Sequence, residues 1–246
     1  MSLRLNLRRQ KLETDENGYR VWRTHETAEE FAAGETALVL CDVWDKHWAR
    51  CANERLALLL PRMNETVKAA RKKGVLIVHS PSDTMGFYKD SPARKRVLDA
   101  AKAPPPEPLA HDDPPQPIDA SDQGCDTPPD QPHSAWSRQH PAIEIDESKD
   151  MISDDGVELY NLYRQRGIKN VIIMGVHTNM CVLGRTFAIK QMVRWGFNVA
   201  LVRDLTDCMY SPARPPYVSH DEGLRLIIEF IEKFWCPTVL SKDLLR

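Results

Sequence analysis

Four apolar runs that continue without alternation constrain the fold more than any other feature of this sequence. They lie at 36–43 (TALVLCDV), 74–80 (GVLIVHS), 170–176 (NVIIMGV) and 198–204 (NVALVRD). A strand that is apolar on both faces is typical of a parallel sheet covered by helices on each side. The sequence therefore predicts strands that are buried on both faces.

Helical patterns alternate with these runs, at 53–74, 153–167, 180–196 and 221–235. The first three end in basic residues and a glycine, which is typical of a helix C-terminus. The alternation predicts an α/β fold, an open doubly wound sandwich with a mostly parallel central sheet. We expect residues 1–246 to form one domain with an N-terminal extension over 1–35.

Residues 103–141 interrupt this alternation with 11 of the 18 prolines. Proline fixes φ and lacks a backbone donor, so the segment is predicted to be irregular. One interpretation is a disordered surface insertion. The other is a rigid loop over a pocket, which the presence of Cys125, His133 and Trp136 favours.

The composition excludes several classes of function. A formal charge of −2 and a pI of about 6.5 argue against nucleic acid or a membrane surface as a partner. The N-terminus has no apolar region typical of a signal peptide, and no run approaches the length of a membrane span. Six cysteines without a CxxC pair argue against zinc ribbons and thioredoxin-like chemistry. We expect a cytoplasmic protein that acts on a small molecule, needs no cofactor and forms a homo-oligomer.

Polar residues follow the predicted strands where a parallel sheet binds its ligands. Asp42 ends the first run, where a carboxylate is costly unless it has a partner or a task. Cys181 begins a predicted helix, where the amide dipoles favour a thiolate. A thiol, an acid that exchanges protons with it and backbone N–H groups at a tight turn are the parts of an acyl-transfer site.

Two motifs resemble the isochorismatase-like cysteine hydrolases, which include nicotinamidases and carbamoylsarcosine amidase. TALVLCDVWDKHW resembles the strand that ends in the family's aspartate, and GIKNVIIMGVHTNMCV resembles its nucleophile segment. The resemblance covers 36–102 and 142–242. It implies that Cys181 attacks a carbonyl, that Asp42 moves the proton, and that a thioester forms. It also implies an oxyanion hole of the His177 and Cys181 backbone N–H groups, shaped by a cis peptide at Val176–His177.

The family's third catalytic residue is a lysine, for which Lys149 is the candidate. The alternative is that Lys149 belongs to a solvated charged turn with Glu147 and Asp150. If Lys149 lies in the site, the Cys181 pKa should fall below its free value, although Asp42 opposes this.

Five further residues are candidates for substrate binding: Trp44, His47, Thr178, Arg185 and Tyr210. Arg185 lies four residues after Cys181, so a continuous helix would place both on one face. It could bind a substrate carboxylate, or neutralise Asp204 or Asp207.

No metal is expected, although nicotinamidases hold one. Met85 stands where their second ligand, a histidine, is found, and a thioether is a poor zinc ligand beside a carboxylate such as Asp83. His47 and His79 remain as possible ligands. The sequence predicts a hydrolase of small amides, and two alternatives stay open: a vinyl-ether hydrolase of isochorismatase type, and a non-catalytic binding protein.

Overall fold

The computed structural model describes residues 1–246 and has one eight-stranded sheet in the order β2-β1-β8-β7-β6-β3-β4-β5. The strands are β1 (Ser2–Thr14), β2 (Arg20–Ala32), β3 (Thr36–Cys41), β4 (Leu76–Ser80), β5 (Met151–Ile152), β6 (Asn170–Val176), β7 (Asn198–Asp207) and β8 (Thr238–Val239). Strands β3 to β8 pair in parallel, and β1 is antiparallel to both β2 and β8.

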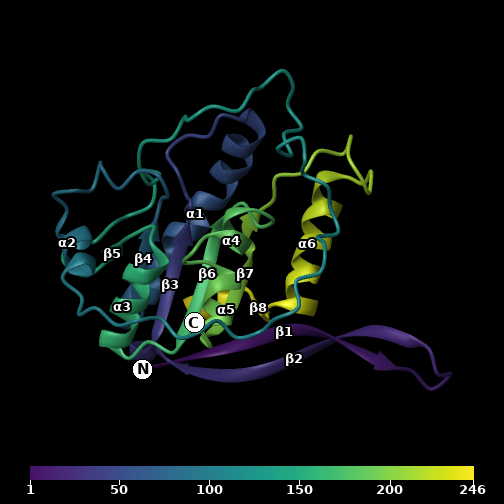
Figure 1. The fold of residues 1–246 in the computed structure, drawn as a ribbon, viewed down its shortest axis with the longest axis horizontal. Coiled ribbons are helices and arrows are strands. Elements are labelled where there is room, and N and C mark those ends of the chain that lie inside the picture. Colours follow the sequence, from purple (N-terminus) through teal and green to yellow (C-terminus); the bar gives the residue numbers. More distant parts are fainter.

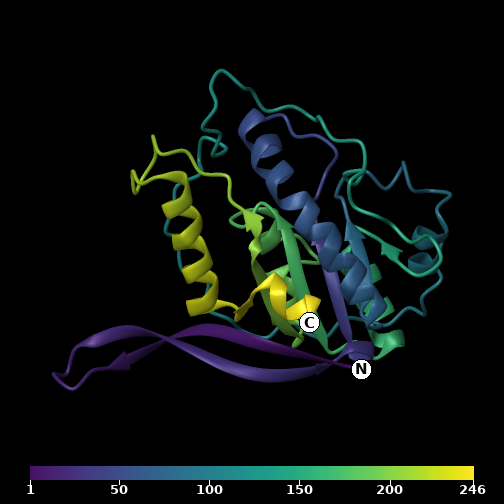
Figure 2. The ribbon, with the colours of Figure 1, turned by 180° about the vertical axis from the view of Figure 1, so that it is seen from behind.

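Helices cover both faces of the parallel part of the sheet (Figures 1 and 2). They are α1 (Arg50–Lys72), α2 (Pro92–Leu98), α3 (Gly156–Arg166), α4 (Cys181–Gly184), α5 (Ile189–Arg194), α6 (His220–Phe234) and α7 (Ser241–Leu245), with a 3₁₀ turn at Ala33–Glu35. The predicted α/β sandwich with a mostly parallel sheet is confirmed. No helix has the length and apolar character that crossing a membrane requires.

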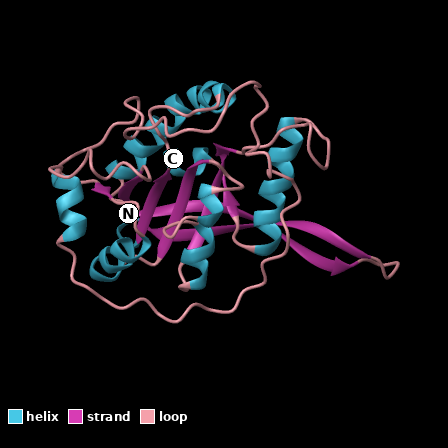
Figure 3. Cartoon of the chain, turned by 45° about the horizontal axis from the view of Figure 1, so that its top comes forward, coloured by secondary structure: helices cyan, strands magenta, loops and turns pink.

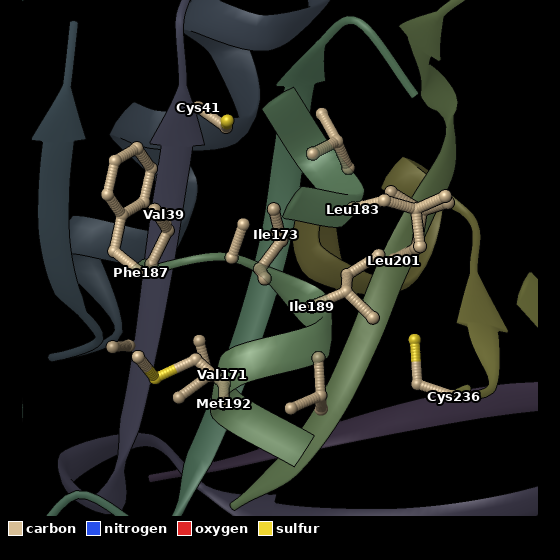
Figure 4. Packing of buried hydrophobic residues seen from close by; sticks show 14 of the residues in the cluster. Val39, Cys41, Val171, Ile173, Leu183, Phe187, Ile189, Met192, Leu201 and Cys236 are labelled. Carbon is tan, nitrogen blue, oxygen red and sulfur yellow. The ribbon is translucent and has the colours of Figure 1, made fainter. Parts of the chain in front are cut away.

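The continuous apolar runs divide their side chains between two cores. Ala37, Val39 and Cys41 of β3 belong to one buried cluster, with residues of α3, α5 and α6. Leu38 and Leu40 belong to the other, with residues of α1 and β1. Figure 4 shows the first cluster, where Ile189 and Met192 of α5 pack near Val171 and Ile173 of β6. Because successive strand residues point to opposite faces, a strand between two helical layers must be apolar at every position.

Residues 1–35, expected as an extension, form a long hairpin that joins the sheet. All thirteen residues of β1 pair with β2, and Arg8 pairs with Thr238 of β8. Leu3, Leu5 and Leu7 are buried at the end near the sheet. The other end of the hairpin projects beyond the helices (Figure 3).

Segment 103–141 contains no helix or strand, as predicted, and it is anchored to the start of α1. The Asp130 carboxylate accepts the Arg50 N–H at 2.8 Å, and the Thr127 hydroxyl accepts the Cys51 N–H at 3.2 Å. The segment thus caps a helix whose own preceding residue, Ala49, has no capping side chain. These contacts favour the interpretation of a rigid loop.

Gly175 brings the ends of β3 and β6 close together. It pairs with Cys41, its φ is +125°, and a Cβ at this position would lie 2.0 Å from the Cys41 carbonyl oxygen. Only glycine fits such a conformation and such a close approach. The residues that follow the two strands, Asp42 and His177, are therefore held near each other.

Gly175→Ala should destabilise the protein by more than about 2 kcal/mol, because it combines a disfavoured φ with a backbone clash. Chemical denaturation would measure the loss. Gly34→Ala is the matched control, since a Cβ there meets nothing within 4 Å. Equal stability of the two variants would contradict the role assigned to Gly175.

Candidate active site

Asp42 is a fully buried carboxylate directly after β3. Its φ of +50° turns the chain out of the strand. One oxygen, Oδ1, accepts the backbone N–H of Ser82 at 2.7 Å, and the other, Oδ2, accepts the Arg185 Nε–H at 2.9 Å. The carboxylate is also close enough to the Cys181 thiol to raise the pKa of that thiol. The carboxylate therefore links three segments of the chain.

Cys181 is the first residue of α4 and follows the turn that ends β6. The Val176–His177 peptide is cis, as the family resemblance implies. In the turn, the N–H groups of Met180 and Val182 donate to the His177 carbonyl, whereas those of His177 and Cys181 have no backbone acceptor. Two backbone donors beside the thiol are therefore open to an oxyanion.

Arg185 reaches Asp42 because the predicted helix 180–196 is broken. Its first turn ends at Gly184, Arg185 adopts an extended conformation with ψ of 153°, and α5 begins only at Ile189. Arg185 and Cys181 therefore do not share a helix face as expected. The guanidinium pairs with Asp42, and its Nη2 lies 3.5 Å from Asp83, so neither Asp204 nor Asp207 is its partner.

The structure does not bring Lys149 to this site. Its side chain is 67% exposed and pairs with Asp146 at 3.1 Å, before the start of β5. Since β3, β4 and β5 are parallel, Lys149 lies at their amino ends, whereas Asp42 lies at the carboxyl end. The first residue after β5 is Ser153. Lys149 and Glu147 are thus exposed, as the alternative interpretation expects, whereas Asp150 is buried and pairs with Arg71 and His79. Arg185 is the cation beside Asp42.

The charges of the site favour a neutral thiol at rest. Burial, and secondarily the Asp42 carboxylate, raise the pKa of Cys181 to about 12, although Arg185 and the His177 backbone lower it. Burial also raises the pKa of Asp42 above its ordinary value, against the lowering effect of Arg185 and of its hydrogen bonds. The expected depression of the Cys181 pKa depended on Lys149, and without that lysine the shift has the opposite sign.

A small cavity of about 10 Å³ lies beside the carboxylate, lined by Asp42, Trp44, His47, Ala52, Leu56, Val176 and His177. Trp44 is buried and donates its indole N–H to the Ser82 carbonyl at 3.0 Å. Trp136 of segment 103–141 stacks on Trp44 with ring centroids 4.3 Å apart. The His47 ring lies 5.8 Å from Trp136, and burial lowers the pKa of His47 to about 4. The proline-rich segment thus packs against two residues that line the cavity, Trp44 and His47.

Thr178 and Tyr210, two predicted substrate-binding residues, do not line this cavity. The Thr178 hydroxyl bonds to that of Thr206 at 2.6 Å. The Tyr210 hydroxyl donates to the Arg214 carbonyl at 2.9 Å, and its ring packs against Gly223. Both residues are fully buried, so they support the turns around the site.

The residues present do not fit the metal site of nicotinamidases. His79 is buried between Gln139 and Asp150, to which its two ring nitrogens bond. Asp83 pairs with Arg185 at the surface, and Met85 packs beside Tyr88.

Asp207, Cys208 and His220 do bring three possible metal-ligand atoms within 4.8 Å of one another. The two ring nitrogens of His220 already face the Tyr210 carbonyl and the Asp207 carboxylate, at 3.1 and 2.9 Å. A buried His–Asp pair accounts for this arrangement.

The sequence did not lead us to Ser82, and it gave Trp136 no contact in the site. Ser82 supplies the N–H that binds Asp42, and Trp136 stacks on Trp44. Ser82 lies just past the carboxyl end of β4, beside β3, so the rule that ligands bind at strand ends could have found it. No sequence signal pairs Trp136 with Trp44.

Comparison with known proteins is consistent with this geometry. The model of the Isochorismatase domain matches residues 36–214. A cysteine hydrolase from Pseudomonas syringae pv. phaseolicola 1448A has 17% identity and a TM-score of 0.52, over 88% of this chain and 93% of its own. An isochorismatase family protein from Burkholderia thailandensis has 17% identity and a TM-score of 0.48, over 86% and 96%. At such identities the likeness shows the fold alone. No curated protein matches the chain.

The thiol of Cys181 should label slowly with iodoacetamide at pH 7 to 8, because only the thiolate reacts and its pKa is raised to about 12. Asp42→Asn removes a nearby anion, so it should lower the Cys181 pKa and speed labelling at pH 8 to 9 several-fold. Mass spectrometry of the Cys181 peptide against pH measures both rates. Asp90→Asn, at an exposed position, is the control. Slower labelling in Asp42→Asn would mean that Asp42 does not act on the thiol as described.

Proposed function

The chain belongs to the isochorismatase family, and on this premise we propose that it is a cysteine-dependent hydrolase that cleaves the C–N bond of a small non-peptide amide. One observation carries the proposal. A fully buried carboxylate, Asp42, lies close enough to the Cys181 thiol to raise its pKa, next to two backbone N–H groups without a backbone acceptor. Nucleophile, proton acceptor and oxyanion donors are the parts that acyl transfer requires.

The first half of the reaction forms a thioester. Because the resting thiol is neutral, Asp42 takes its proton as the sulfur attacks the substrate carbonyl. The backbone N–H groups of His177 and Cys181 stabilise the negative charge that develops on the carbonyl oxygen. The tetrahedral intermediate then expels ammonia or an amine, to which Asp42 returns the proton.

The second half releases the acid. Water attacks the thioester and gives its proton to Asp42, the oxyanion again facing the same two N–H groups. Collapse of this intermediate breaks the C–S bond and frees the carboxylic acid, while Asp42 returns the proton to the Cys181 sulfur. The carboxylate thus acts as base and acid in turn, which requires it to be ionised in the resting enzyme.

Arg185 supplies the positive charge that this cycle needs. Burial favours the protonated form of Asp42, and the guanidinium at 2.9 Å opposes it. The guanidinium also offsets the charge that appears on Cys181 in the course of the attack. We assign to Arg185 the electrostatic role that the family resemblance gives to a lysine.

The walls of the cavity favour a small substrate that enters past Trp136. The cavity has room for about one water molecule, so a substrate requires one of its walls to move. Trp136, which stacks on the lining residue Trp44, is the side chain that we propose moves. The aromatic rings of Trp44 and His47 would then line the widened pocket.

A non-catalytic binding protein is the second candidate, and the absence of a lysine at the carboxyl end of β5 favours it. A binding protein would hold a small molecule without releasing product. The same assays separate the two candidates, because only an enzyme loses turnover when Cys181 is replaced.

Cys181→Ala should abolish ammonia release from a panel of small amides, since no other group can form the thioester. Asp42→Asn should slow the same reaction by about 10²–10⁴, the usual contribution of general acid–base catalysis. A coupled ammonia assay, with circular dichroism to verify folding, makes the measurement. Release of vinyl-ether cleavage products by both variants would favour the isochorismatase-type alternative.

Arg185→Met should reduce kcat/KM by about 10²-fold or more, because it leaves a buried carboxylate without its countercharge. Since Asp42 would then hold its proton to higher pH, the acidic limb of the pH–rate profile should move upward. Lys149→Met is the matched control and should retain full activity. Loss of activity in the Lys149 variant alone would return that lysine to the mechanism and exclude Arg185.

A further inference from the structure

Strand β2 presents an open backbone edge along its whole length. It is the outermost strand of the sheet and pairs with β1 alone. Its thirteen residues contain neither proline nor glycine, and their register with β1 is free of bulges. Prolines and bulges normally protect the edge of a sheet, because its unpaired N–H and C=O groups would otherwise pair with another strand. Strand β2 lacks this protection. The hairpin also extends away from the helices, so the edge is open to a large partner (Figures 1 and 3).

The charges on β2 are sorted by sign along the strand. Arg20 and Arg23 lie in its first half, Glu26 lies at its centre, and Glu29 and Glu30 lie in its second half. All five side chains belong to exposed residues. The only ion pair among them within the chain is the loose contact of Arg23 with Glu13, at 3.6 Å. These charges are therefore available to a partner strand.

Two copies of β2 in antiparallel order would be complementary to each other. A two-fold axis reverses the strand, so the basic half of one copy faces the acidic half of the other. In the register that sets Arg20 opposite Glu30, Arg23 lies opposite Thr27 and diagonal to Glu29. Opposite charges at these positions stabilise a pair of strands. Near the axis His25 faces its own copy, and the two Glu26 side chains are diagonal to each other, so the attraction comes from the two ends of the strand.

We propose that β2 is the interaction surface for a second copy of this chain, with the two β2 strands pairing antiparallel into one continuous sheet. The contact is isologous, so the pairing closes at two copies and leaves no further edge at that place. Trp22 lies opposite Ala28 in this register, and the part of its ring that the contact with Phe234 leaves exposed adds apolar area. The proposal is independent of the hydrolase activity.

Two charge-reversal variants test the interface. Size-exclusion chromatography with light scattering should give twice the mass of one chain for the unaltered protein. Arg20→Glu with Arg23→Glu makes the whole strand acidic, and Glu29→Arg with Glu30→Arg makes it basic. Each double variant should be a monomer at the same concentration, because like charges then face each other across the two-fold axis.

Mixing the two double variants should restore the dimer, since an acidic strand then meets a basic one at both ends. Arg9→Glu with Lys11→Glu, the same charge change on β1, should leave the dimer intact. Circular dichroism establishes that each variant folds. A monomeric unaltered protein, or a dimer that survives both reversals, would overturn the proposal.

Discussion

The ion pair between Asp42 and Arg185 is the interaction on which the site depends. A carboxylate with no exposed surface costs several kcal/mol to bury unless it is paired and fully hydrogen-bonded. Asp42 meets that condition through donors from two other parts of the chain, the Ser82 N–H after β4 and the Arg185 guanidinium after α4. Each donor fixes a piece of backbone, so the carboxylate determines where β4 ends and where the helix after Cys181 must break.

The fold and the central pair of residues were accessible from sequence because each follows from a local rule. Continuous apolar runs require helices on both sides, and the ends of parallel strands gather polar residues, which placed Asp42 and Cys181 together. The pairing of Arg185 with Asp42 was not predicted, because the helical pattern continues through 185–188, whereas the backbone leaves the helix there, extended at Arg185 and Ala188 with a turn between them. A contact across 143 residues that depends on such a break has no local signature. The hairpin does have a local signature, the alternation of Leu3, Leu5 and Leu7 with polar residues. A search for continuous apolar runs does not detect it.

The raised pKa of Cys181 protects its sulfur chemically. The thiolate is the form that attacks peroxides and disulfides, so a neutral and partly buried thiol resists oxidation. The stack of Trp136 on Trp44 adds a physical barrier beside the same cavity. In the mechanism proposed above, the sulfur becomes reactive only when Asp42 takes its proton.

The pairing of β1 with β8 has a consequence for synthesis on the ribosome. Arg8 of β1 pairs with Thr238 of β8, so β1 joins the parallel part of the sheet only through a strand that is made much later. At about 5–20 residues per second, the intervening 230 or so residues take roughly 10–50 s to translate. During that interval the nascent hairpin has both of its outer edges unpaired. Neighbouring chains on one polysome would meet in that state, which makes the hairpin the part of this protein most in need of a chaperone.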